Sequence, residues 1–210
     1  MKAAAIVYVH GLYLSGHEAF LLRRRLVQAH GYHWHSFSYA STYLSMDEIA
    51  TALAEFVATI DAPSVHLLGH SMGGVVILRY MERKPEFPPG RVVFMGTPAQ
   101  PSRAAASVAR FMFGRMVLGQ AASDELVPAH NREWHSSREL GLIVGSQPFS
   151  LGRLVVQFDE PNDGTVAVSE TLVPGAKARI VLPESHTGML LSARVAEEVG
   201  SFLETGYFTT

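Results

Sequence analysis

Short apolar runs alternate with helical segments along most of the chain. All but one of these runs are rich in Val, Ile or Leu and apolar at nearly every position, not at every second one. Such runs are typical of strands covered on both faces, and strands separated by helices are joined by right-handed parallel crossovers. The pattern predicts an α/β fold, a doubly wound parallel sheet with helices on both faces. The expected strands are Ala4–His10, Trp34–Tyr39 (the weakest), Val65–Gly69, Arg91–Gly96, Leu140–Gly145, Leu154–Phe158 and Arg179–Leu182.

Two of the expected helices begin with a serine followed by a glutamate three residues later, at Ser15–Glu18 and Ser45–Glu48. In a capping box of this kind, each side chain accepts a hydrogen bond from the backbone amide of the other residue. The first helix is expected to end at Gly31, which can adopt the left-handed conformation that closes a helix. Two more helices are expected, one after Ser71 and one near the carboxyl terminus.

Composition narrows the class of protein. The chain has 210 residues, of which 48% are hydrophobic and 17% charged, so it is too apolar for a disordered protein. We expect a single domain over residues 1–210. The net charge of −2 and the lack of a basic stripe argue against a nucleic-acid partner. No apolar run approaches the ~18 residues of a membrane span, and Ala3–Val9 is a poor signal peptide, so a cytoplasmic protein is expected.

Several kinds of site are excluded by residue type and spacing. The chain contains no cysteine, which rules out disulfides, thiolate metal sites and a cysteine nucleophile. No pair of histidines or carboxylates has the spacing of metal ligands. We therefore expect neither a metal nor another cofactor.

The stretch from Pro98 to Glu139 interrupts the alternation. It contains roughly forty residues without a clear strand, which is long for a plain connection. Within it, Ala104–Leu118 is expected to be helical and carries Phe and Met on more than one side. Two interpretations stay open. One is an ordinary crossover helix packed on the sheet; the other is a cap or lid insertion over residues 99–139 whose Phe and Met side chains face an apolar substrate.

The sequence Gly69-His70-Ser71-Met72-Gly73, followed by Gly74, lies between an expected strand and an expected helix. A serine at such a sharp turn is held in a strained conformation with its hydroxyl exposed. Glycines are needed two residues to either side, because a Cβ there would collide across the turn. The helix amino terminus also places partial positive charge beside the serine. Ser71 is therefore the candidate nucleophile, with Gly69 and Gly73 as supporting residues.

A serine hydroxyl needs a base to accept its proton, and the base needs an acid to orient it. His186 directly follows the last expected strand and precedes the last helix, at the sheet edge where parallel α/β proteins build their sites. The other histidines lack such a position. His66 begins a strand, and His70 lies inside the turn with the wrong geometry for a base. His186 is the candidate base.

The acid is expected after the strand Leu154–Phe158. Asp163 lies there in the turn Asn-Asp-Gly-Thr, which can present a carboxylate outward. Asp159 and Glu160 are the competitors, because they lie closer to the end of that strand. We prefer Asp163 as the acid that orients the base.

An oxyanion requires two backbone donors directed at the developing charge. One is the amide of Met72, directly after the nucleophile. The other is expected from Leu12, in the loop after the first strand, where Gly11 allows a tight turn. His10 is expected to support this loop and not to transfer protons.

Taken together, these residues resemble the α/β-hydrolase fold family, and within it the small lipases and esterases. The resemblance spans residue 4 to about residue 205, and Ser71, Asp163 and His186 follow the chain order of that fold. It implies about six parallel strands, because the first expected strand matches the one that usually comes third. A His-Gly-Leu loop in place of a run of glycines favours simple esters over esters of tertiary alcohols. The motifs that carry the resemblance are His10-Gly11-Leu12, Gly69–Gly74, Gly96-Thr97-Pro98, Asn162–Thr165 and Ser185-His186-Thr187.

The resemblance implies a serine hydrolase of the esterase or lipase type, which cleaves a small acyl ester or a lipid through an acyl-enzyme on Ser71. The same triad would serve a thioesterase, an amidase, a lactonase or an acyltransferase, and the sequence does not separate these. A binding module with a silent site is a third interpretation. It is disfavoured because candidates for all three triad members are present.

Overall fold

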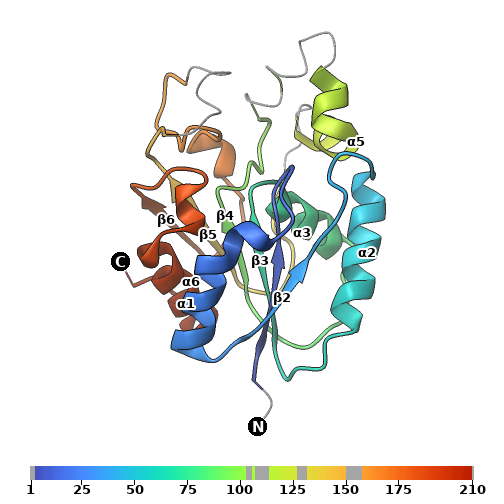
Figure 1. The fold of residues 1–210 in the computed structure, drawn as a ribbon, viewed down its shortest axis with the longest axis vertical. Helices are drawn as coiled ribbons and strands as arrows, with labels where there is room; N and C mark the ends of the chain where they lie inside the picture. Colours follow the sequence, from blue (N-terminus) through green and yellow to red (C-terminus); the bar gives the residue numbers. More distant parts are fainter. Residues whose placement is uncertain (1–2, 103–105, 107–113, 127–131, 150–157, 210) are drawn as a thin grey trace.

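The computed structural model describes residues 3–102, 106, 114–126, 132–149 and 158–209. Within them, six strands form one sheet in the order β2-β1-β3-β4-β5-β6, and every neighbouring pair is parallel (Figure 1). The chain adds β2 on one side of β1 and the remaining strands on the other, which makes the sheet doubly wound. The strands are β1 (Ala5–Val9), β2 (His33–Phe37), β3 (Val65–His70), β4 (Val92–Met95), β5 (Leu140–Gly145) and β6 (Ala178–Leu182).

The predicted α/β class and parallel sheet are confirmed, including the weakest expected strand, which corresponds to β2. One expected strand, Leu154–Phe158, has no counterpart in the described sheet. Residues 154–157 lie outside the described residues, and Phe158 is not part of a strand. Among the described residues, the strand that precedes β6 is therefore β5.

Helices cover both faces of the sheet, which explains why the central strands β1, β3, β4 and β5 are buried at every position. The edge strands β2 and β6 are only partly buried. In β1, Ala5, Val7 and Val9 pack into one buried cluster, and Ile6 and Tyr8 into another. The first cluster lies under α2 (Met46–Ala58) and α3 (Met72–Glu82). The second lies under α1 (Phe20–His30) and α6 (Ala193–Thr205), which run side by side (Figure 1).

The two expected capping boxes have different outcomes. The box at Ser45 is present, with both of its reciprocal hydrogen bonds. The box at Ser15 is wrong, because Gly16 takes a φ of 95° and the chain enters a short 3-10 helix, η1 (His17–Ala19), before α1. The Glu18 carboxylate still accepts from the amides of Ser15 and Gly16, but the Ser15 side chain makes no cap bond in return.

The stretch expected to hold an insertion is described in part. Its helix α5 (Gly114–Leu126) consists of two pieces joined at Gly119, whose φ of 78° and ψ of 172° are not helical. Gly119 packs on the backbone of Thr42, since a Cβ added there would lie 2.4 Å from the Thr42 Cα. The second piece is buried in the same cluster as α2 and α3. Most of the expected helix Ala104–Leu118 lies outside the described residues.

All six strands run in one direction, so their carboxyl ends form a single edge, at the top of Figure 1. Two short 3-10 helices, η3 (Ser169–Thr171) and η4 (Gly188–Leu190), flank β6 in the chain. No helix in the described part of the chain is both long and apolar enough to cross a membrane.

Candidate active site

Ser71 forms the junction between β3 and α3. Its backbone has φ 54° and ψ −127°, a conformation that residues other than glycine rarely adopt. The Ser71 amide donates to the carbonyl of Met95 at 2.9 Å, which fixes the turn to the end of β4. The side chain is partly exposed. The residue predicted as the nucleophile thus lies at the carboxyl edge of the sheet in the strained turn that its motif indicates.

Gly69 and Gly73 allow the backbone segments around Ser71 to approach one another. A Cβ on Gly69 would lie 2.6 Å from the Cα of Gly74, which is a collision across the turn, as expected. A Cβ on Gly73 would instead lie 2.0 Å from the carbonyl oxygen of Val9. Gly73 is therefore required because the start of α3 abuts the end of β1, and not by the turn itself.

Asp163 and His186 form a buried pair. The Asp163 Oδ2 lies 2.7 Å from the His186 Nδ1. The other carboxylate oxygen accepts from the amides of Thr165 and Val166, at 2.9 and 2.7 Å. An ionised carboxylate only accepts hydrogen bonds, so Nδ1 of His186 carries the proton. When the imidazole is neutral, Nε2 is then the nitrogen that can accept a proton.

The turn that carries Asp163 reaches this pair from beside β5. A Cβ on Gly145, the last residue of β5, would lie 2.7 Å from the Cβ of Asp163. The strand predicted to precede the acid, Leu154–Phe158, lies almost wholly outside the described residues, and the strand end that meets the acid is that of β5. The structure brings Asp163 to His186, whereas the competitor Asp159 is exposed.

Gly96 is part of this site, although no motif in the sequence predicts a site role for it. It follows β4 with a φ of 55°. A Cβ on Gly96 would lie 3.0 Å from the Asp163 Oδ2 and 3.1 Å from the His186 Nδ1. The absence of a side chain therefore leaves room for the pair. The sequence feature that includes Gly96 is the Gly96-Thr97-Pro98 motif. It carries part of the resemblance to the α/β-hydrolase fold family but assigns no role to Gly96.

Ser71 and His186 lie at the same edge of the sheet, and within the described residues no hydrogen bond joins the Ser71 hydroxyl to the His186 imidazole. The His186 ring lies 4.8 Å, centroid to centroid, from the ring of His70, the residue before Ser71. Bonds between catalytic groups are often long in unliganded proteins and shorten when substrate binds. The arrangement is therefore compatible with proton transfer between the two residues.

His10 holds the loop that follows β1. Its ring is buried, and Nδ1 donates to the carbonyl of Gly11 at 2.7 Å while Nε2 accepts from the amide of Tyr39 at 3.2 Å. Burial lowers the pKa of His10, in keeping with a neutral ring. The Gly11 carbonyl belongs to the same planar peptide unit as the Leu12 amide, so His10 fixes the direction of the Leu12 N–H. Tyr39 also donates its hydroxyl to the His10 carbonyl at 2.8 Å, and no sequence motif indicates this residue.

The two predicted oxyanion donors lie on segments that contact Ser71. A Cβ on Gly11 would lie 3.0 Å from the Cβ of Ser71, so the loop that carries Leu12 packs directly against it. Met72 is the first residue of α3, where backbone amides have no acceptor within the helix. Both segments therefore bring backbone N–H groups to the neighbourhood of the Ser71 hydroxyl.

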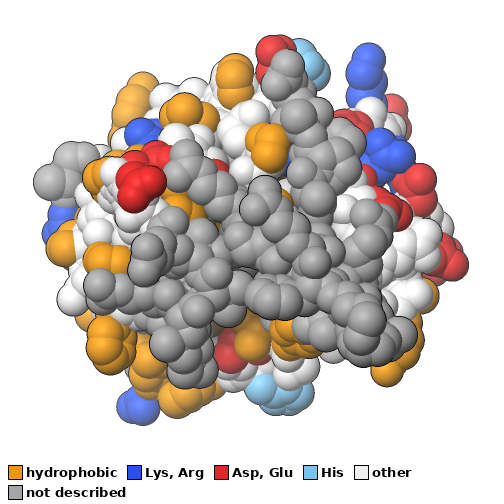
Figure 2. All heavy atoms as spheres, turned by 90° about the horizontal axis from the view of Figure 1, so that it is seen from above, with side chains coloured by type: hydrophobic (Ala, Val, Ile, Leu, Met, Phe, Trp, Pro, Cys, Tyr) orange, Lys and Arg blue, Asp and Glu red, His pale blue; other side chains and the backbone are white. Residues whose placement is uncertain are grey.

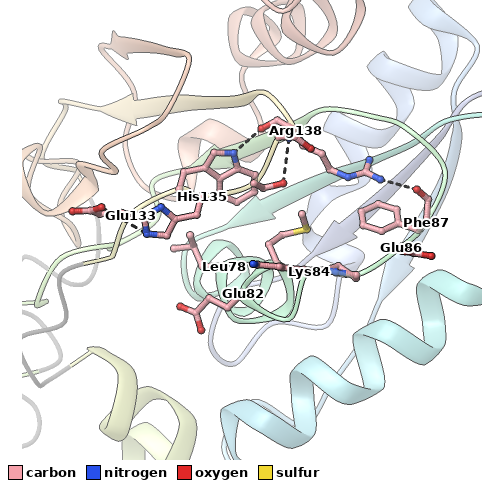
Figure 3. A pocket seen from close by; sticks show the side chains of 13 residues that line it. Leu78, Glu82, Lys84, Glu86, Phe87, Glu133, His135 and Arg138 are labelled. Atoms are coloured by element: carbon pink, nitrogen blue, oxygen red, sulfur yellow. Dashed lines mark hydrogen bonds and ion pairs between the residues drawn. The ribbon is translucent and has the colours of Figure 1, made fainter.

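A cavity of about 630 Å³ lies at the opposite edge of the sheet (Figure 3). It is bordered by the end of α3 and by the loops that enter β4 and β5, with Leu78, Phe87 and Arg138 among its lining residues. The Arg138 guanidinium donates to the carbonyls of Phe87, Pro88 and Gly90, so it serves the local structure. The cavity lies at the amino ends of the strands and Ser71 at their carboxyl ends, so it does not belong to this site.

Three aromatic side chains are exposed on segments that leave the carboxyl ends of strands. They are Tyr13 after β1, Tyr43 after β2 and Phe149 after β5, which are 59%, 85% and 78% exposed. In the view from this end, hydrophobic side chains lie at several places around the margin, where charged side chains also lie (Figure 2). The loops at the edge that holds Ser71 therefore carry exposed aromatic side chains.

The described groups can supply one kind of chemistry. They comprise a strained serine, a histidine oriented by a buried carboxylate, and backbone amides beside the serine, which together suit nucleophilic attack on an acyl carbon. Among the described residues, no three or more His, Cys, Asp or Glu side chains are grouped so as to hold a metal ion.

Comparison with known proteins agrees with this architecture. The sequence profile of the alpha/beta hydrolase family matches residues 6–198. No curated protein matches the chain. Among solved structures, the mature form of the lipase BlEst2 from Bacillus licheniformis has a TM-score of 0.77 and 17% identity, covering 97% of this chain and 91% of the lipase.

Two further solved structures share the fold. A pyrethroid hydrolase from Sphingobium faniae JZ-2 has a TM-score of 0.67 and 15% identity, covering 97% of this chain and 98% of that one. A lipase-esterase related protein from Clostridium acetobutylicum ATCC 824 has a TM-score of 0.64 and 13% identity, covering 95% and 94%. At such identities the likeness establishes the fold.

Proposed function

Because the chain belongs to the alpha/beta hydrolase family, we propose that it is a serine hydrolase that cleaves carboxylic esters through an acyl-enzyme on Ser71. The observation that carries the proposal is the 2.7 Å contact between Asp163 and His186 at the sheet edge that also holds the strained Ser71. A buried carboxylate that orients an imidazole beside a strained serine is the arrangement that activates a hydroxyl.

The reaction proceeds in two halves. The Ser71 Oγ forms a bond to the acyl carbon, and its proton passes to the His186 Nε2. The bond to the leaving alkoxide breaks as His186 returns that proton to it, which releases an alcohol and leaves an ester on Ser71. Water then attacks the same carbon with His186 again as the base. The bond from that carbon to the Ser71 Oγ breaks, His186 returns the proton to Oγ, and the carboxylic acid leaves. Asp163 holds the ring and stabilises the imidazolium formed in each half.

The amides of Leu12 and Met72 would stabilise the negative oxygen of each tetrahedral intermediate. A donor of this kind lowers the barrier by about 3 kcal/mol. The bond from His10 to the Gly11 carbonyl supports this role twice over. It fixes the orientation of the shared peptide unit, and it polarises that unit so that the Leu12 N–H becomes a stronger donor.

Exposed aromatic side chains at the Ser71 edge favour an acyl ester or lipid with a hydrophobic acyl chain. Tyr13, Tyr43 and Phe149 are exposed there, and α5 packs on the adjoining segment at Thr42. In this proposal residues 99–139 form a cap that borders the acyl chain. The proposal also includes a single domain over residues 1–210, of which this cap is a part.

Hydrolysis of p-nitrophenyl esters, from acetate to palmitate, tests the proposal, with Ser71→Ala as the matched inactive variant. We expect hydrolysis that is abolished by Ser71→Ala without loss of the fold. Activity confined to short chains would mean a small pocket with the cap as a wall. Activity that rises with chain length would mean an acyl groove under the cap.

Two results would contradict the proposal. Ester hydrolysis that survives Ser71→Ala would place the nucleophile elsewhere. The absence of activity on every ester, together with no labelling of Ser71 by an active-serine phosphonate, would favour a silent binding site. Labelling without ester hydrolysis would point to a thioester, amide or lactone substrate, which matched substrates of each class would distinguish.

A further inference from the structure

His70 contacts three parts of the proposed site at once. It is the last residue of β3, it is covalently joined to Ser71, and its side chain is almost fully buried. Its Nε2 lies 2.9 Å from the main-chain carbonyl oxygen of His186. On its other side, a Cβ on Gly11 would lie 3.5 Å from its Nδ1. Its ring therefore lies between the loop of the base and the loop that carries Leu12.

The hydrogen bonds of His70 define its protonation. A carbonyl only accepts, so Nε2 carries the proton and donates to His186. Nδ1 is buried and has no partner among the described residues. Burial, followed by the proximity of His186, lowers the pKa of His70 to about 3. His70 is therefore neutral and does not compete with His186 for the serine proton.

The main chain of His186 is held from two directions. Its amide donates to the carbonyl of Asp163 at 2.9 Å, and its carbonyl accepts from His70. One bond connects the base to the acid, and the other connects it to the residue next to the nucleophile. The His70 side chain is thus a hydrogen-bonded link between the loop of the base and the turn that carries Ser71.

We infer that His70 is a positioning residue that sets the base His186 against the nucleophile Ser71 through its bond to the His186 carbonyl. The inference rests on the proposed function and adds a residue to it. It also accounts for a buried histidine at a position where an apolar side chain would avoid an unpartnered nitrogen. A misplacement of about 1 Å between reacting groups can cost about 100-fold in rate, so one such bond matters for catalysis.

Two amide variants separate the bond from the general need for a polar side chain. In His70→Gln the amide nitrogen can reach the position of Nε2, whereas in His70→Asn it reaches only the position of Nδ1. We expect His70→Asn to lower kcat about 10- to 100-fold with KM within about twofold, and His70→Gln to restore most of the loss. The rate of Ser71 labelling by an active-serine phosphonate should fall in parallel with kcat.

The matched control is His66→Gln, which changes a buried histidine at the other end of the same strand. It should leave kcat and KM unchanged. If His70→Asn does not fold, His70→Phe replaces it, since it keeps a ring and removes the donor. If His70→Gln and His70→Asn (or His70→Phe in its place) have equal kcat values, the inference is overturned. Failure of the proposed function would give a different result. The wild-type protein would then show neither Ser71-dependent ester hydrolysis nor Ser71-dependent labelling.

Discussion

The main chain and the side chain of His186 are both hydrogen-bonded to Asp163. The His186 amide donates to the Asp163 carbonyl at 2.9 Å, and the imidazole Nδ1 donates to the carboxylate at 2.7 Å. The first bond places the loop that carries the base, and the second orients its ring. A change confined to the carboxylate should therefore alter the chemistry while the main-chain bond keeps the loop in place.

Asp163→Asn tests this separation. The amide keeps one oxygen for the amides of Thr165 and Val166, but its NH2 group cannot accept from the His186 Nδ1. The imidazole loses both the bond that fixes its tautomer and the charge that stabilises the imidazolium. We expect kcat for p-nitrophenyl butyrate to fall by about 10³- to 10⁴-fold, with little change in the thermal unfolding followed by circular dichroism.

The control for this prediction is Asp159→Asn, because Asp159 is the alternative acid in the sequence and is exposed. Its activity should stay within about twofold of wild type, as for most surface substitutions. A large loss in Asp159→Asn, with activity retained in Asp163→Asn, would reverse the choice of acid.

Gly96→Ala is expected to lower activity through the same pair. The new Cβ would lie 2.7 Å from the Met189 Cε, 3.0 Å from the Asp163 Oδ2 and 3.1 Å from the His186 Nδ1. Met189 must then move, and the pair must shift by a few tenths of an ångström. Since a misplacement of about 1 Å can cost about 100-fold, this smaller shift should lower kcat by about 10-fold. The measurement is kcat and KM on a short-chain ester, with stability followed by urea unfolding.

Gly31→Ala is the matched control for Gly96→Ala. Gly31 closes α1 as predicted, with a φ of 69° against 55° at Gly96, and a Cβ on it would meet nothing within 4 Å. Both variants carry the strain of a left-handed alanine, about 1 kcal/mol, but only one crowds the site. Equal activities in the two variants would show that Gly96 acts through backbone strain alone.

His10→Phe should weaken the oxyanion donors and spare substrate binding. Phe keeps the ring that stacks on Tyr39 at 4.2 Å, but it removes the bond to the Gly11 carbonyl that directs the Leu12 amide. We expect kcat to fall by about 10- to 100-fold with a small change in KM, because the donors act mainly on the transition state.

Tyr39→Phe provides the comparison for His10→Phe. It removes only the hydroxyl bond to the His10 carbonyl and leaves the Tyr39 amide bound to Nε2. Its loss of kcat should therefore be clearly smaller. A KM effect in His10→Phe as large as its kcat effect would point to a collapsed pocket and not to a misdirected amide.

The sequence indicates the fold well because strands such as β1 are buried on both faces, and continuous apolar runs reveal that burial without help from distant residues. Predictions weaken where tertiary contacts decide. The Ser15 capping box fails because Gly16 turns the chain before the helix begins. Gly73 is predicted correctly as a required glycine, but the expected reason is wrong. A Cβ on it would collide with the carbonyl of Val9, at the end of β1, and not with the turn itself.

The candidate site shows the same division. The motifs around Ser71, Asp163 and His186 identify residues that the fold places together at one edge of the sheet. No motif assigns a role to the residues that hold them in place, such as Tyr39, which lies outside the motifs, and His70, which lies next to Ser71. Their contribution depends on which carbonyl or ring nitrogen lies within hydrogen-bond distance, and a single sequence does not contain that information.

His66 should give the protein a stability that falls in acid independently of the catalytic site. Burial and the charges of Arg91 and Arg138 lower the pKa of His66 to about 4 in the folded protein, below its ordinary 6.5. Between those two pH values the unfolded chain binds a proton that the folded chain does not, so stability rises with pH through this range. The loss on going from pH 7.5 to pH 5 is about 2 kcal/mol for this one group.

His66→Asn should flatten this dependence. The Asn oxygen can replace Nδ1 as the acceptor for the Arg91 amide, a bond of 2.9 Å, and it does not titrate. Urea unfolding at pH 5 and 7.5 should give a difference smaller by about 2 kcal/mol than in wild type, with ester hydrolysis at pH 7.5 unchanged. His135→Asn, at a side chain that is 79% exposed, is the control and should leave the difference unaltered. If His66→Asn keeps the wild-type pH dependence, the acid sensitivity belongs to other buried groups. His70 and His10 are the first to test, because burial lowers their pKa values as well.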